Sequence, residues 1–262
     1  MLGFFIFGDT LPMTHATRDP ALPWLLDGQD FPPPHSAWGE ATSAPGLLAA
    51  GGSLDVASLC KAYRQGIFPW FSRDQPPLWW STDPRMVLKV HDFRLTISLR
   101  KQIRSLLKQK RLVVHMDRCF PLVITQCATS PRAGQSGTWI VPEMVRAYQL
   151  LHEAGFVHSV ETWLDGKLVG GLYAVNMGRM VFGESMFSHV SNASKIALCA
   201  LVGFCRHEAM PMIDCQQQTP HLASLGANPV ERSTFLVEVS ALTSHPSPLW
   251  QFEAKHWDTV LG

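Results

Sequence analysis

The opening third of the chain is dense in proline and tryptophan, and this limits what it can fold into. Residues 20 to 84 hold five of the nine tryptophans, Trp24, Trp38, Trp70, Trp79 and Trp80, and a large share of the prolines, including Pro32, Pro33, Pro34, Pro69, Pro76, Pro77 and Pro84. Each proline removes a backbone donor and restricts the residue before it, so long helices are excluded. The many aromatic side chains argue against disorder. We expect a small irregular domain over residues 1 to 91, with one short helix near residues 56 to 65 and no assigned role for residues 1 to 20.

The pattern changes near residue 92 to alternating helices and strands. Amphipathic or capped segments predict helices at 97–110, 142–154 and 193–207, and apolar runs predict strands at 112–116, 157–164, 167–175, 179–186 and 212–215. The Asp165-Gly166 pair predicts a hairpin turn, and a second turn is expected at residues 176 to 178. A meander of antiparallel strands, then a helix and a further strand, is an α+β pattern. We expect residues 92 to 262 to form this second domain, with no assigned role for the tail after about residue 238.

Charge and cysteine content exclude several classes of protein. With 22 basic and 21 acidic residues the net charge is +1, so a protein coated uniformly for nucleic acid is excluded, although a local basic patch is allowed. Neither the six cysteines nor His158, His207 and His221 show a zinc-type spacing. We therefore expect buried thiols, structural histidines, and no metal. The apolar start, Met1 to Phe7, is too short and wrongly flanked for a signal peptide or a membrane span, and we predict a cytoplasmic protein.

A one-sided basic helix is the first candidate functional feature. Seven basic residues and no acidic one lie between residues 94 and 111. At helical spacing Arg100, Lys101, Arg104 and Lys108 share one face, next to an apolar stripe. Such a face repels itself unless a polyanion such as an RNA backbone neutralises it. The alternative is an ordinary solvated helix face.

Two sets of polar residues at strand ends are the next candidates. Asp214 and Gln216, two apart on a strand, are predicted to share a face and a hydrogen-bond network, while Cys215 between them points into the core. A structural role for this pair remains the alternative, and a Cys215 nucleophile is a weak hypothesis. Glu184 is either a surface carboxylate or a site residue. Phe187 stands where a G-x-S-x-G nucleophile elbow needs glycine, which excludes that motif.

Ten short blocks, spread over residues 31 to 236, occur in a characteristic order. They are GLLAAGG (46–52), GIFPWFS (66–72), LWWSTDPR (78–85), GTWI (137–140), HSVE (158–161), GGLY (170–173), GESMFS (183–188), NASK (192–195), IDCQ (213–216) and HLASLGA (221–227). Together they resemble the leucyl/phenylalanyl-tRNA–protein transferase family. The resemblance implies a small N-terminal domain followed by a domain with the acetyltransferase (GNAT) fold and a central, mostly antiparallel sheet.

The resemblance also implies an activity. The family moves leucine, phenylalanine and less readily methionine from aminoacyl-tRNA to the α-amino group of proteins with N-terminal Arg or Lys, which marks them for N-end-rule degradation. No cofactor is implied, because the aminoacyl ester is already activated, and the family-based oligomeric state is a monomer. The family's acidic residue and glutamine fall on Asp214 and Gln216, and its motif glutamate falls on Glu184.

A binding pocket is implied as well. The family's pocket for the apolar side chain and the terminal adenosine maps onto Trp70, Trp139, Leu172 and Met186. Val181, Leu201 and Cys205 stand where bulky aromatics can occur in the family. The preference among leucine, phenylalanine and methionine is therefore open.

Two mechanisms and two other functions stay open at this point. In one mechanism Asp214 polarises Gln216, which orients or deprotonates the attacking amine, while Glu184 pairs with the basic residue of the acceptor. In the other the donor's ribose hydroxyl relays the proton, and Asp214 and Gln216 act electrostatically. An acyl-CoA N-acyltransferase would need a Q/R-x-x-G-x-G/A loop, and the nearest stretch, residues 132 to 137, has its glycines at the wrong spacing. A non-catalytic tRNA-binding module is the remaining alternative.

Overall fold

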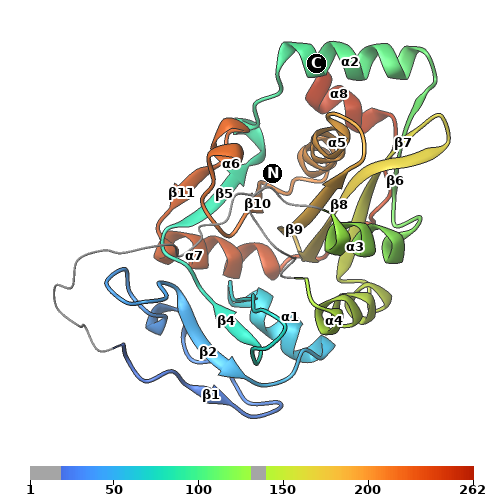
Figure 1. The fold of residues 1–262 in the computed structure, drawn as a ribbon. Helices are drawn as coiled ribbons and strands as arrows, with labels where there is room; N and C mark the ends of the chain where they lie inside the picture. Colours follow the sequence, from blue (N-terminus) through green and yellow to red (C-terminus); the bar gives the residue numbers. More distant parts are fainter. Residues whose placement is uncertain (1–18, 131–139) are drawn as a thin grey trace, which may run out of the picture.

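Two β-sheets organise the protein. The computed structural model describes residues 19–130 and 140–262, and Figure 1 shows the smaller sheet below the larger one. The strand order is β1-β2-β4-β3 in the smaller sheet and β11-β5-β10-β9-β8-β7-β6 in the larger. Neighbouring strands of the larger sheet are antiparallel except for β9 and β10, which are parallel. The fold is therefore α+β, as the sequence predicts.

Short strands and one helix make up the smaller sheet and its cover. The strands are β1 (Trp24–Leu25), β2 (Leu47–Gly51), β3 (Phe68–Pro69) and β4 (Leu78–Trp80), and the helical segments are α1 (Val56–Arg64) and the 3₁₀ turn Pro34–Ser36. A second 3₁₀ turn, Val90–Asp92, follows β5 of the larger sheet. The side chain of Asp55 caps α1 by accepting from the backbone N–H of Ser58 at 2.8 Å. Trp79 is fully buried, and its Nε1 donates to the carbonyl of Gly51 at 2.8 Å. Tryptophan burial thus orders this proline-rich region.

The larger sheet contains the predicted meander. Its strands are β5 (Arg85–Lys89), β6 (Leu112–Met116), β7 (Val157–Leu164), β8 (Lys167–Met177), β9 (Met180–Ser188), β10 (Met212–Asp214) and β11 (Asn228–Val230). The second turn is tighter than predicted, because Asn176 lies inside β8 and its buried amide donates to the carbonyls of Gly178 and Met180. β5, expected within the N-terminal region, pairs with β10 and β11 in the larger sheet.

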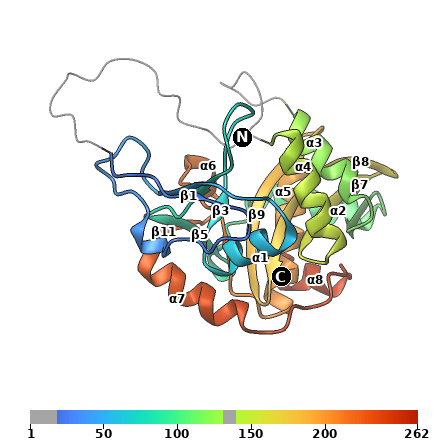
Figure 2. The same ribbon diagram turned by 90° about the horizontal axis from the view of Figure 1, so that it is seen from below.

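Helices cover both faces of the larger sheet. They are α2 (Ile97–Lys108), α3 (Phe120–Thr129), α4 (Pro142–Glu153), α5 (Ala193–His207), α6 (Pro220–Ser224), α7 (Arg232–Thr243) and α8 (Lys255–Leu261). Figure 1 shows α2, α5 and α8 on one side of the sheet and α3 and α4 on the other, and Figure 2 gives the view from below. The sequence missed α3 because its residues are nearly all apolar and show no polar face. None of these helices is long and apolar enough to cross a membrane.

The two sheets share one of the two hydrophobic cores. Trp79 of the smaller sheet, Phe182 of the larger sheet and Phe120 of α3 belong to the same buried cluster. Within it Tyr63 of α1 packs against Phe182 of β9, with ring centroids 5.0 Å apart. β10 ends at Asp214, opposite Phe182, whereas β9 continues to Ser188. This packing directs side chains from α1, α4 and β5 toward the part of β9 that extends beyond the end of β10.

Candidate active site

An apolar cavity opens where β9 continues past the end of β10. Its lining residues are Leu88, Leu172, Tyr173, Gly183, Glu184, Ser185, Met186, Leu198, Leu201, Ile213, Cys215, Gln216 and Leu222. Leucine, isoleucine and methionine make most of the wall, with Glu184 and Gln216 as polar groups. An apolar cavity with a few converging polar groups is the usual form of a small-molecule site. The structure thus brings five predicted site residues together: Leu172, Glu184, Met186, Leu201 and Gln216.

Glu184 is held in a buried hydrogen-bonded cluster. Its side chain accepts from the hydroxyl of Tyr63 at 2.8 Å, from the hydroxyl of Tyr148 at 3.1 Å and from Nε2 of Gln216 at 3.3 Å. Burial raises the pKa of Glu184 to about 8, although the two tyrosine hydrogen bonds act in the opposite direction. The carboxyl group is therefore mostly protonated at pH 7.

The two tyrosines were not predicted. Tyr63 comes from α1 and Tyr148 from α4, and their hydroxyls also contact each other. Burial, followed by the nearby Glu184, raises the pKa of both phenols well above the ordinary value. Both hydroxyls consequently stay protonated and act as donors. No sequence pattern links the three residues, because they meet only through tertiary packing.

Asp214 forms a buried ion pair with Arg85. Nε of Arg85 donates to Oδ1 of Asp214 at 2.8 Å and Nη2 donates to Oδ2 at 2.7 Å, and both side chains are fully buried. The guanidinium lies between the rings of Phe68 and Phe235, 4.6 Å from each centroid. A bidentate, charge-assisted pair of this kind fixes the carboxylate in position. The one sequence feature that could have indicated a buried role for Arg85 is its position at the start of an apolar strand.

The predicted alternation of Asp214 and Gln216 on one strand face is wrong. The strand ends at Asp214, and Gln216 adopts a left-handed conformation with φ 54°. Its backbone N–H donates to Oδ1 of Asp214 at 2.9 Å, while its side chain turns to Glu184. Asp214 therefore holds the backbone of Gln216. Cys215 is half-buried and packs against the core, as predicted, but it also lines the cavity. Burial raises the pKa of its thiol to about 12, which suppresses the thiolate.

Other predicted pocket residues lie elsewhere. Val181 and Cys205 are fully buried, but neither lines this cavity. Val181 pairs with Ile213 across the β9–β10 ladder, before the cavity opens. Trp70 packs against Trp80 outside the cavity, with ring centroids 5.3 Å apart. Trp139 lies outside the described residues.

The basic helix forms as predicted, as α2. Lys101, Arg104 and Lys108 are exposed and Arg100 is half-buried. In the described part of the chain none of these four pairs with an acidic side chain. Arg104 instead donates from Nη2 to the carbonyl of Leu261 at 2.8 Å and to that of Gly262. Part of the face therefore anchors the end of α8, and the rest points into solvent.

The α+β fold carries an apolar cavity with Glu184 and Gln216 in its wall, the form that small-molecule sites of enzymes usually take. Models of the leucyl/phenylalanyl-tRNA protein transferase and of its N-terminal domain match residues 87–240 and 52–83. Among similar curated proteins, each named leucyl/phenylalanyl-tRNA–protein transferase, that of Albidiferax ferrireducens is 56% identical, covering 94% of this chain and 97% of its own. Those of Polaromonas sp. and Leptothrix cholodnii are 57% and 54% identical, covering 92% and 90% of this chain and 94% of each of theirs. The chain belongs to this family of aminoacyltransferases.

Two solved structures also match at a distance. They are L-PGS from Bacillus licheniformis, with 9% identity and a TM-score of 0.37 over 59% of this chain and 48% of that one, and a conserved protein from Bacteroides thetaiotaomicron, with 12% identity and a TM-score of 0.40 over 63% and 58%. Similarity at this level bears on neither the fold nor the function of this chain.

Proposed function

We propose that the protein transfers leucine or phenylalanine from aminoacyl-tRNA to the α-amino group of proteins that begin with Arg or Lys. The observation that carries the proposal is the leucine-lined cavity with the Gln216–Glu184 hydrogen bond in its wall. The names of the relatives support an aminoacyl-tRNA donor and a protein acceptor. In this proposal the cavity binds the apolar side chain of the transferred amino acid, and Glu184 and Gln216 face its ester group.

The chemistry asks mainly for orientation. The amine nitrogen attacks the ester carbonyl carbon, a C–N bond forms, the C–O bond to the ribose breaks, and the amine proton ends on the departing ribose oxygen. Holding the two reactants in line can supply about 7–11 kcal/mol. The α-amino group, with a reference pKa of about 7.7–8.0, has a useful neutral fraction at neutral pH. The activated ester needs no added cofactor.

Each polar residue then has a distinct role. Gln216 orients the attacking amine through its amide oxygen, because its Nε2 donates to Glu184. Asp214, fixed by Arg85, positions Gln216 through the backbone rather than polarising its side chain. Glu184 gives up its proton and pairs with the basic residue of the acceptor. The donor's ribose hydroxyl carries the transferred proton.

We also infer an organisation and a cellular role. Residues 19–84 act as a small N-terminal domain, and residues 85–262 form an acetyltransferase-type domain, since β5 pairs in the larger sheet. The mostly antiparallel sheet with one parallel pair beside the cavity supports this assignment. The protein acts as a cytoplasmic monomer that marks acceptors for N-end-rule degradation.

The test is transfer of radiolabelled leucine and phenylalanine from charged tRNA onto peptides beginning with Arg, Lys or Ala. Label on the Arg and Lys peptides alone, without added nucleotide or metal, is the expected result. Equal labelling of the Ala peptide would contradict the acceptor rule. No label on any peptide, from folded protein that still binds tRNA, would favour the non-catalytic tRNA-binding module.

The cavity wall is expected to set the amino-acid preference. Leu201→Phe adds volume to the wall, so phenylalanine should lose more than leucine, and the Phe-to-Leu transfer ratio should fall about tenfold. Competition between the two charged tRNAs measures this ratio. Val237→Phe, on the exposed face of α7, is the control and should leave the ratio unchanged. The same Phe-to-Leu transfer ratio in both variants would show that the side chain of the transferred amino acid binds outside this cavity.

The solvent-facing cations of α2 are expected to contact the tRNA backbone. Replacing Lys101 and Lys108 with alanine should weaken tRNA binding and reduce the slope of log K against log[salt] by about one unit for each lost phosphate contact. Fluorescence anisotropy at several salt concentrations measures the slope. Lys167→Ala, at the exposed start of β8, is the control. An unaltered slope in the double variant would make α2 an ordinary solvated helix.

A further inference from the structure

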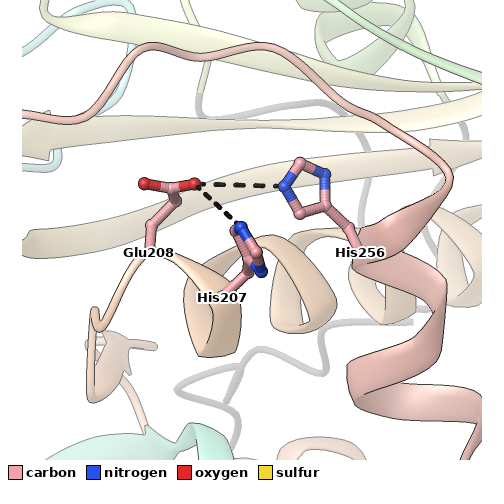
Figure 3. A group of neighbouring side chains, drawn as sticks. All are labelled: His207, Glu208 and His256. Carbon is pink, nitrogen blue, oxygen red and sulfur yellow. Dashed lines mark ion pairs between the residues drawn. The ribbon is translucent and has the colours of Figure 1, made fainter.

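Two histidines and a glutamate meet at the end of α5, away from the residues of the cavity. His207 ends α5, Glu208 follows it, and His256 lies in the first turn of α8. Oε1 of Glu208 is 3.9 Å from Nε2 of His207 and 4.0 Å from Nε2 of His256. One ligand atom of each residue lies within 4.8 Å of the others. Figure 3 shows both imidazole rings directed toward the same carboxylate oxygen.

His256 is the unusual member of this cluster. Its side chain is only 1% exposed, and its Nε2 has no hydrogen-bond partner among the described groups. Buried polar atoms are nearly always paired, so an unpaired nitrogen aimed at a carboxylate calls for an explanation. The 4.0 Å separation from Glu208 is too long for a direct hydrogen bond.

The separations suit ligands around a shared ion. Zinc binds histidine nitrogens and carboxylate oxygens at about 2.0–2.2 Å, which places ligand atoms roughly 3.4 Å apart in a tetrahedral site. The two separations from Glu208, 3.9 and 4.0 Å, need to shorten by about half an ångström, and the histidine nitrogens, which lie within 4.8 Å of each other, need to approach by up to about 1.4 Å. Glu208 is half-buried and His207 is exposed, so their side chains have room for this movement.

We propose that His207, Glu208 and His256 bind a divalent transition-metal ion of the Zn²⁺ type, with solvent completing its coordination. Two imidazoles and one carboxylate are donors that zinc accepts readily. No spacing pattern predicts the site, because His256 lies far along the chain from His207 and only the packing of α8 on α5 brings them together. The inference is independent of the proposed aminoacyl transfer.

Metal binding would have a structural consequence at the start of α8. Nδ1 of His256 accepts from the backbone N–H of Glu253 at 2.9 Å, so Nε2 carries the proton of the neutral ring. Ligation through Nε2 moves the ring proton to Nδ1 and breaks this hydrogen bond. The Glu253 N–H then needs another acceptor, and so does the proton on Nδ1. Loss of this hydrogen bond lowers the affinity for the metal ion by a factor on the order of ten. The bound ion links α8 to α5.

The site is tested with Zn²⁺ and the full-length protein, by competition with a chromogenic chelator. One Zn²⁺ per chain and a rise of several degrees in the Tm are expected. His207→Ala and Glu208→Gln should each weaken binding at least tenfold, and neither change disturbs the buried core. His91→Ala is the matched control, since His91 is exposed beside Asp92, with Nε2 3.5 Å from Oδ1, and should leave the affinity unchanged.

Cobalt substitution separates this site from the cysteines. Co²⁺ bound by nitrogen and oxygen should show no thiolate-to-metal charge-transfer band, although the chain contains six cysteines. A thiolate band would overturn the proposal. So would wild-type protein that binds no Zn²⁺, or an affinity that both site variants leave unchanged.

Discussion

Replacing Arg85 with methionine is expected to lower the free energy of unfolding by about 3–5 kcal/mol, because it leaves the Asp214 carboxylate buried without its partner. Transfer should fall at least a hundredfold in the same variant, since Asp214 then no longer holds the backbone of Gln216, and a displacement of about 1 Å costs roughly that much. Urea unfolding and single-turnover transfer measure the two effects.

The double variant Arg85→Met, Asp214→Asn separates charge from position. It removes both buried charges but keeps an oxygen that can accept from the Gln216 backbone, so most of the lost stability should return. Transfer should return to within about tenfold of wild type if Asp214 acts by positioning. Recovered stability with no recovered transfer would contradict that role, and would show that the negative charge of Asp214 takes part in the reaction.

Glu184→Gln is expected to change how stability depends on pH. The folded protein keeps the Glu184 proton up to a pKa of about 8, whereas the unfolded chain releases it near the ordinary glutamate pKa of 4.5. The stability from this group is fully present below pH 4.5 and is lost as the pH rises through 8, with a slope of up to about 1.4 kcal/mol per pH unit. The variant should lose this slope. Glu153→Gln, exposed at the end of α4, is the control and should keep it.

The same residue should link acceptor binding to pH. An acceptor with an N-terminal Arg pairs with ionised Glu184, so the KM for Arg peptides should fall as the pH rises toward 8 and level off above it. In Glu184→Gln the KM should be higher, at least tenfold, and show no such fall. A wild-type pH profile in the variant would assign acceptor recognition to another group.

Local patterns predicted the elements whose information lies within a few residues. The β7–β8 hairpin was predicted from the apolar runs on either side of Asp165-Gly166, and α5 begins and ends where its pattern predicts. The polar cluster depends on packing across sheets instead. Tyr63 and Tyr148 reach Glu184 from separate helices, which no spacing rule anticipates.

Strand alternation was the rule that failed at the site. It assumes that the strand continues, but the left-handed conformation of Gln216 ends the ladder and sends the amide to Glu184. Val181 shows a limit of prediction from motif positions. The family motif predicted Val181 as a pocket residue. Val181 is instead buried in the β9–β10 pairing, and the cavity begins beyond that pairing.

The most direct measurement is single-turnover transfer of leucine from leucyl-tRNA to an Arg peptide by Gln216→Ala, with tRNA affinity measured in parallel. Loss of the group that orients the amine should slow transfer about a hundredfold or more. The affinity for tRNA should stay close to that of the wild type, because Gln216 lies at the cavity and not on α2. Transfer at the wild-type rate would show that the reaction does not take place beside Gln216.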